Sequence, residues 1–128
     1  MIEHLAIWSK DLEQLTAFYV RYFNCQACGR YCNPRNGFAS YFLSFASGAR
    51  LELMQMPGIA NLAKQPTKQY FGFAHMAIAL GSAAAVDALY QRLLADGVEV
   101  LDQPHHTGDG YYEFTLLDPE ANRIEITI

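Results

Sequence analysis

The stretch EHLAIWSKDLEQLTAFY (residues 3–19) returns in related form as AHMAIALGSAAAVDALY (residues 74–90). Both contain the pattern H-[LM]-A-I and both end in tyrosine. A second pair, SGARLELMQ (residues 47–55) and EANRIEITI (residues 120–128), aligns in the same order, with an Arg, an aliphatic residue and a Glu superimposed. Two blocks that match in the same order at nearly the same offset predict one unit of about 60 residues used twice.

The first unit has the pattern of a strand, a helix and a β-hairpin. Residues 2–8 alternate as a strand does, and residues 11–23 carry an apolar stripe at helical spacing. A turn at Ser47–Gly48 separates strand-like residues 41–46 and 50–56, which predicts a hairpin. A weaker strand is predicted over about 27–32. The apolar stripe consists of Leu12, Leu15, Phe18, Tyr19 and Phe23.

The second unit repeats this order. A helix is predicted over residues 83–96, ending at Gly97. Strands are predicted over 73–80, 98–101, 111–117 and 123–128. A chain of 128 residues is too short for two independent domains, so we expect one domain, residues 1–128. The expected fold class is α+β, with two tandem βαβββ modules: module 1 is 1–56, the linker is 57–71 and module 2 is 72–128.

Composition excludes several classes of protein. About half of the residues, 52%, are apolar, which is too many for a disordered chain. The formal net charge is −4 and no run of Lys or Arg occurs, which argues against a nucleic-acid or anionic-membrane partner. The chain has no signal peptide pattern and no apolar stretch long enough to span a bilayer. We therefore expect a soluble, cytoplasmic protein that binds a small-molecule substrate.

Strand alternation predicts where four polar residues point. His4, Glu52, His75 and Glu125 each lie opposite the apolar side of their strand, which the module's helix can cover. A carboxylate in mid-strand is costly if it is buried without a partner. One divalent cation bound by two His and two Glu would remove that cost and balance the charge. The repeated occurrence of one early His and one late Glu in each module predicts a metal site.

These segments resemble the glyoxalase/bleomycin-resistance/extradiol-dioxygenase group, also called the vicinal oxygen chelate superfamily. The similarity is carried by EHLAI, SGARLEL, GFAHMAIAL and the closing DPEANRIEI, which resembles the family's D-P-x-G-N-x-[IV]-E ending with Ala121 in place of Gly. The resemblance covers nearly the whole chain. It implies paired βαβββ modules whose curved mixed sheets enclose a metal, with His4, Glu52, His75 and Glu125 at the ligand positions.

Within that family, the four ligand positions favour the glyoxalase I branch. Extradiol dioxygenases use two His and one carboxylate, whereas Glu52 supplies a fourth ligand here. The resemblance implies a lactoylglutathione lyase-like lyase or isomerase that acts on a small carbonyl or hemithioacetal substrate through an enediolate. Trp8 occupies the position where glutathione-dependent members commonly have Arg, so other carbonyl substrates remain open. A dioxygenase, a thiol transferase and a non-catalytic small-molecule binder are the alternatives.

The resemblance also implies a cofactor, a base and an assembly. The cofactor is one divalent metal ion per site, with nickel, cobalt or zinc preferred over manganese or iron. Glu125 is expected to be the proton-transferring carboxylate, with Glu52 as the other candidate. A homodimer is expected, in which each site combines the first module of one chain with the second module of its partner.

Three further residues are candidates for substrate binding: Trp8, Tyr111 and His106. The loop Gln103–Gly110, with His105 and His106, could close over a site. Cys25, Cys28 and Cys32 are clustered, but no fourth nearby ligand completes a zinc site, so ordinary reduced thiols are expected.

Overall fold

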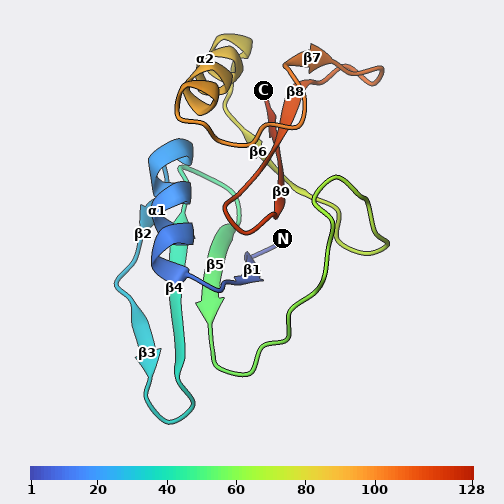
Figure 1. Cartoon of the computed structure of the whole chain (residues 1–128). Helices are drawn as coiled ribbons and strands as arrows, with labels where there is room; N and C mark the ends of the chain where they lie inside the picture. Colours follow the sequence, from blue (N-terminus) through green and yellow to red (C-terminus); the bar gives the residue numbers. More distant parts are fainter. The chain divides into compact units, whose positions relative to one another are not determined.

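The computed structural model describes all residues, 1–128, and contains two compact units, Met1–Leu62 and Ala63–Ile128. Each unit contains one helix and one sheet (Figure 1). The boundary between the units lies within the segment predicted as the linker. The α+β class and the division into two sheets are therefore confirmed. No helix has the length and apolar character needed to cross a membrane.

The first unit builds a five-stranded sheet beside one helix. β1 and β5 pair in parallel, and the other pairings are antiparallel. The strand order is β1-β5-β4-β2, and β3 also pairs with β4. The single strand predicted near 27–32 is split into two short ones. In chain order the elements are β1 (His4–Trp8), α1 (Leu12–Phe23), β2 (Gln26–Ala27), β3 (Tyr31–Asn33), β4 (Phe38–Ser44) and β5 (Arg50–Gln55).

The second unit is a βαβββ module with strand order β6-β9-β8-β7. β6 and β9 are parallel, as β1 and β5 are, and β9-β8-β7 are antiparallel. The topological match between the two units confirms the tandem repeat of related modules. Its elements are β6 (Met76–Ala79), α2 (Ala83–Ala95), β7 (His105–His106), β8 (Tyr112–Leu117) and β9 (Arg123–Thr127).

Both helices begin at a side-chain cap, and a left-handed residue stands at the end of α1 and one residue beyond the C-cap of α2. The Asp11 carboxylate accepts a hydrogen bond from the Gln14 amide at 3.1 Å, and the Ser82 hydroxyl accepts one from the Ala85 amide at 3.2 Å. α1 ends at Asn24 with φ 48°, and α2 is followed by Gly97 with φ 72°. These caps fix where each helix begins and ends.

One face of each sheet is buried with the helix of its own unit. In unit 1 the predicted apolar stripe of α1 is buried throughout, together with Leu51 and Leu53 of β5. In unit 2 the buried face of α2 accompanies Phe114 of β8 and Ile124 and Ile126 of β9, all 0% exposed. Because strand residues alternate, the intervening residues of β5 and β9 lie on the opposite face.

Further predicted elements differ in the structure. The strand predicted over 41–46 lies earlier, at Phe38–Ser44. The strand predicted over 73–80 is shorter and begins at Met76, so His75 immediately precedes β6. The strand predicted over 98–101 is reduced to a single bridge between Val100 and Leu116. A two-residue strand, β7, forms instead inside the predicted loop Gln103–Gly110 and pairs with β8.

Candidate metal centre

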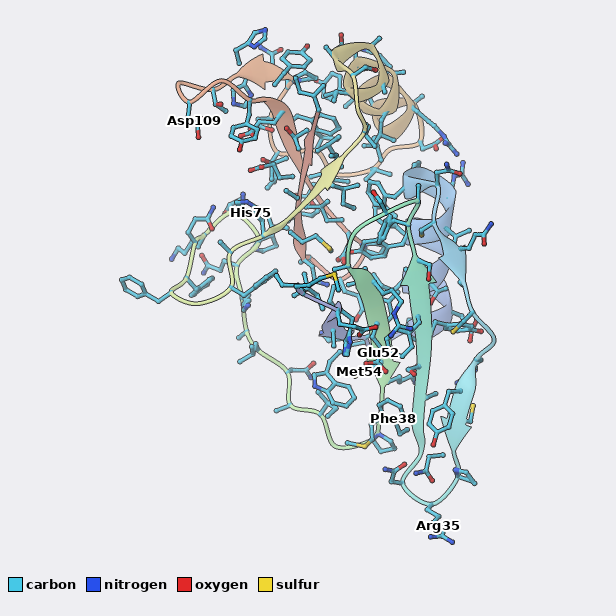
Figure 2. All side chains as sticks on the ribbon, turned by 180° about the vertical axis from the view of Figure 1, so that it is seen from behind. Arg35, Phe38, Glu52, Met54, His75 and Asp109 are labelled. Carbon is cyan, nitrogen blue, oxygen red and sulfur yellow. The ribbon has the colours of Figure 1, made fainter.

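In the first unit, strand register brings His4 and Glu52 together. Ala6 of β1 is the direct partner of Glu52 on β5, and His4 lies two residues earlier on the same face of β1. The imidazole Nε2 of His4 is 3.8 Å from a carboxylate oxygen of Glu52. Figure 2 shows Glu52 and Met54 on β5 beside Phe38 of β4.

The second unit reproduces the arrangement. Ala77 of β6 is the direct partner of Glu125 on β9, as Ala6 is of Glu52. The Nε2 atom of His75 is 3.3 Å from a carboxylate oxygen of Glu125. The side-chain exposures also match: the two histidines are 39% and 40% exposed, and the two glutamates are 14% and 19% exposed. Each unit therefore holds one partly buried carboxylate against one imidazole at the same position of the repeat.

Glu3 orients the imidazole of His4. Its carboxylate accepts a hydrogen bond from Nδ1 of His4 and also pairs with the Arg50 guanidinium. Both hydrogen bonds lower the pKa of the Glu3 carboxyl; the one with His4 has the larger effect and the one from Arg50 the next largest. A carboxylate on one ring nitrogen directs the other nitrogen toward a ligand, which is the usual arrangement for a metal-binding histidine. Residue 74 is Ala, so His75 has no equivalent of Glu3.

The donor atoms suit a divalent metal ion. Imidazole nitrogen and carboxylate oxygen bind such ions at about 2.0–2.2 Å, which places neighbouring ligands about 3–3.5 Å apart. The His75–Glu125 separation of 3.3 Å lies in that range, and the His4–Glu52 separation of 3.8 Å is slightly wider. No group of three or more side chains suited to a metal ion occurs in either unit. Each unit thus brings together two side chains of the types that bind divalent ions.

Two ionisable side chains, Glu113 and His105, share the face of Glu125, a placement that the sequence did not predict. Glu113 of β8 pairs with Thr127, so it lies diagonally across from Glu125 on the same face, and His105 of β7 pairs with Glu113. Burial and then the charge of Glu125 raise the pKa of the Glu113 carboxyl. Alternation along β8 could have placed Glu113 on this face, but only with the β8–β9 register known.

The three candidate substrate-binding residues lie in different surroundings. Trp8 is 42% exposed, and its ring lies 6.2 Å from that of Phe38 in an edge-on arrangement. Tyr111 is 52% exposed and precedes β8. His106 contacts the ring of Tyr112, whose hydroxyl donates to Asp87 of α2, so His106 lies on the helix side of the sheet. Of the two adjacent histidines, His105 shares the face of Glu125.

The cysteines do not form a disulfide. Cys25 is buried, whereas Cys28 and Cys32 are exposed. Burial raises the pKa of the Cys25 thiol. No metal-binding group includes them.

Comparison with known proteins identifies relatives by sequence and by fold. The family model for the glyoxalase/bleomycin resistance protein/dioxygenase superfamily matches residues 1–126. No curated protein sequence matches the chain.

Among solved structures, a possible glyoxalase from Bacillus cereus is 26% identical, with a TM-score of 0.72, covering 100% of this chain and 98% of that one. The trypanothione-dependent glyoxalase I of Leishmania major is 20% identical, with a TM-score of 0.77 and coverages of 99% and 85%. A glyoxalase I mutant from Zea mays is 20% identical, with a TM-score of 0.78 and coverages of 98% and 43%. The last two show the likeness of fold, and the family model shows the kinship: the chain belongs to the glyoxalase/bleomycin resistance protein/dioxygenase superfamily.

Proposed function

We propose that the protein is a metal-dependent lyase or isomerase of the glyoxalase I type, acting on a small carbonyl or hemithioacetal substrate. The observation that carries the proposal is the equivalence of the two His–Glu pairs. Each glutamate lies on one of the two parallel strands of its unit, and each histidine lies at or just before the start of the other, at the same register; both carboxylates are partly buried. A bound cation would offset the cost of burying the two carboxylates, which supports a metal-dependent protein.

The proposed ligands of one divalent metal ion are His4, Glu52, His75 and Glu125. When bound, such an ion polarises a carbonyl oxygen as a Lewis acid. A fourth protein ligand leaves fewer open positions on the metal than the three-ligand sites of non-haem iron oxygenases have, which favours proton transfer over oxygen activation.

The carboxylates supply the proton transfer in this proposal. Glu125 takes the proton from the carbon next to the substrate carbonyl and returns it to the former carbonyl carbon, so that the substrate is isomerised without net oxidation. Glu52 and Glu125 each lie in the middle of an interior strand, since β5 runs between β1 and β4 and β9 runs between β6 and β8. We assign the mobile, proton-carrying role to Glu125, as the family resemblance implies, and the fixed role to Glu52. Glu3 holds the His4 ring in place.

Paired isosteric variants test the assignment. Glu125→Gln keeps the shape and an oxygen ligand but removes the base, so turnover of a hemithioacetal should fall by about 10²- to 10⁴-fold. Glu52→Gln at equal metal occupancy is the matched control and should lose less. A larger loss in Glu52→Gln, with metal still bound, would reverse the two roles.

A substrate panel tests the reaction class. Hemithioacetals of methylglyoxal with glutathione and with other thiols should be assayed after loading with nickel, cobalt, zinc, manganese or iron. Trp8 offers no charge to a glutathione carboxylate, so thiols without that carboxylate should be turned over at least as well. Oxygen uptake with catechols would assign a dioxygenase instead, and ligand binding with no turnover under any metal would assign a binding protein.

We also propose a homodimer with two sites, each built from His4 and Glu52 of one chain and His75 and Glu125 of the other. Support comes from the division of the ligands, one pair in each unit. Mixing His4→Ala chains with His75→Ala chains, after unfolding and refolding together, then leaves one intact site in each mixed dimer. Activity should return to about a quarter of the wild-type value for random pairing of two chains. No recovery, or full activity in a monomer, would contradict the dimer.

A further inference from the structure

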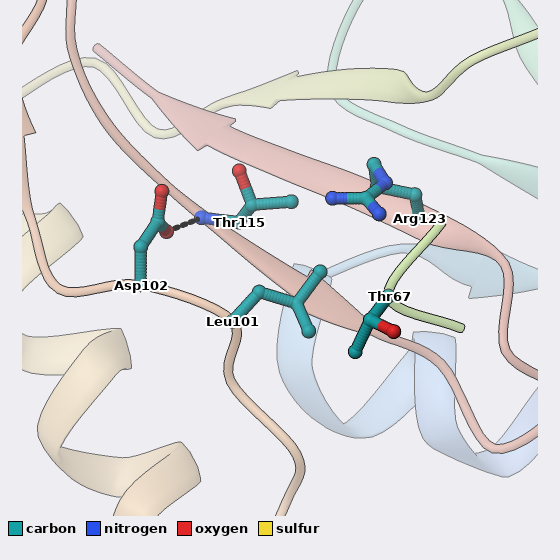
Figure 3. Close-up of a pocket in the computed structure, with 5 residues that line it drawn as sticks. All are labelled: Thr67, Leu101, Asp102, Thr115 and Arg123. Carbon is teal, nitrogen blue, oxygen red and sulfur yellow. Dashed lines mark hydrogen bonds between the residues drawn. The ribbon is translucent and has the colours of Figure 1, made fainter. Parts of the chain in front are cut away.

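The second unit contains a pocket of about 290 Å³ on the open face of its sheet. Thr115, the direct partner of Glu125 on the neighbouring strand, forms part of its wall, so the pocket adjoins the His75–Glu125 pair. The residues that line it are Thr67, Leu101, Asp102, Thr115 and Arg123 (Figure 3).

The repeat explains why the pocket is open. Arg123 of β9 is equivalent to Arg50 of β5, because each stands two residues before the glutamate of its unit. In unit 1 the guanidinium of Arg50 lies 4.2 Å from the centre of the Phe42 ring and pairs with Glu3. An aromatic ring and a carboxylate therefore occupy the space around Arg50 and balance its charge.

Both of these partners are replaced in unit 2. Phe42 is the direct partner of Glu52, and the equivalent partner of Glu125 is Thr115. Glu3 precedes His4, and the residue that precedes His75 is Ala74. In unit 2 the small Thr115 side chain therefore stands where unit 1 has a phenylalanine ring, and the methyl group of Ala74 stands where unit 1 has the Glu3 carboxylate. The change opens a space and removes the counter-charge from the remaining arginine.

Arg123 forms no ion pair, although the Asp102 carboxylate lines the same pocket. One guanidinium nitrogen donates to the Pro66 carbonyl at 3.2 Å. The Asp102 carboxylate has other partners: one oxygen accepts a hydrogen bond from the Thr115 amide at 2.5 Å, and the other lies 4.0 Å from Nδ1 of His105. A guanidinium carries five N–H donors in a planar fork, so most of them remain for a ligand.

We propose that this pocket binds a carboxylate of the substrate, so that the substrate is a small carbonyl compound that also carries a carboxylate. This inference rests on the proposed function. A planar fork of donors matches a carboxylate in two parallel hydrogen bonds, and the Thr67 and Thr115 hydroxyls can donate to the same group. Leu101 contributes an apolar wall for a short carbon chain.

The spacing limits the size of the substrate. Arg123 and Glu125 are two residues apart on β9, which separates their Cα atoms by about 6.6 Å. The carboxylate and the carbon that loses its proton should therefore be only a few bonds apart. The pocket volume is at the small end of the range for ligand sites, in keeping with a short acid rather than a peptide.

Binding of succinate to the metal-free, full-length protein tests the pocket without requiring catalysis. Calorimetric or NMR titration should show saturable binding of succinate and none of succinamide, its uncharged analogue. Arg123→Met should weaken succinate binding by about 10- to 100-fold, the range expected for a lost charge-assisted hydrogen bond. Arg50→Met, the equivalent change in unit 1, should leave it unchanged.

A second variant refills the pocket. Ala74→Glu combined with Thr115→Phe restores the surroundings of Arg50 around Arg123 and should abolish succinate binding in a folded protein. No binding to the wild type, equal binding of succinamide, or equal losses in Arg123→Met and Arg50→Met would overturn the pocket. Succinate binding through Arg123 without turnover of any hemithioacetal would refute the proposed function but keep the carboxylate site. Turnover of a hemithioacetal without succinate binding would refute the carboxylate site but keep the proposed function.

Discussion

Replacing Ala121 with glycine should stabilise the protein. Ala121 has φ 64°, the left-handed region, in the turn between β8 and β9. The turn is held firmly: the Asp118 carboxylate accepts hydrogen bonds from the Glu120 and Asn122 amides, both at 2.9 Å, and the Ala121 amide donates to the Asp118 carbonyl at 3.0 Å. The backbone therefore keeps this conformation whichever residue stands at 121.

The magnitude follows from two opposing contributions. The left-handed conformation costs a residue with a Cβ atom about 1–2 kcal/mol. Glycine loses about 0.5–1 kcal/mol more backbone entropy than alanine on folding. The net gain in the free energy of unfolding for Ala121→Gly is therefore about 0.75 kcal/mol, within a range of about 0–1.5 kcal/mol; the middle value corresponds to a rise of roughly 2–4 °C in Tm.

Urea and thermal unfolding followed by circular dichroism measure the effect. Ala88→Gly is the matched control, because Ala88 is exposed in the middle of α2. That change should lower the free energy of unfolding by about 1 kcal/mol. If Ala121→Gly destabilises the protein as Ala88→Gly does, the reasoning from the left-handed backbone is refuted.

Three other expectations concern thiols, pH and the core. Cys28 and Cys32 should react quickly with a disulfide reagent in the native protein, whereas buried Cys25, with its raised pKa, should react only on unfolding; three equally fast thiols would contradict this. The pKa of Glu113 is raised in the folded protein, so folding favours its protonated form. The stability that this gives is fully present below the ordinary pKa of a glutamate, and it is lost as the pH rises through the pKa of Glu113 in the folded protein. In metal-free protein, Glu113→Gln should therefore stabilise at pH 7 relative to wild type, with the gain disappearing near pH 3; a gain that grows toward low pH would contradict the sign. Leu53→Ala removes a side chain that is 0% exposed and should cost about 2–5 kcal/mol in urea unfolding; a loss below about 1 kcal/mol would show that Leu53 is not part of a packed core.

Much of the fold was predictable because the repeat and the alternation are local signals. The apolar stripe of α1 and the hairpin around Gly48 are visible in a few adjacent residues, and Gly48 has φ 87° as such a turn requires. The positions of Glu52 and Glu125 on the face opposite the buried aliphatic residues follow from a period of two.

The elements that were missed depend on partners distant in sequence. β7 has only two residues, and its pairing with β8 cannot be read from the local sequence. Val98–Leu101 has strand-forming residues, but its pairing with β8 amounts to one bridge, between Val100 and Leu116, with the backbone hydrogen bonds of Glu99 and Leu101 on either side. The pocket at Arg123 also requires the register, because Thr115 must be placed beside Glu125 before its small size is seen to matter.

Metal content tests the central claim most directly. The wild-type protein, loaded with nickel, cobalt or zinc and then desalted, should retain about one divalent ion per chain by elemental analysis, as one four-ligand site for each chain requires. His75→Ala and Glu125→Ala should lose most of that metal, whereas His106→Ala, on the helix side of the sheet, should keep it. Full stoichiometric metal in both His75→Ala and Glu125→Ala would contradict the ligand set.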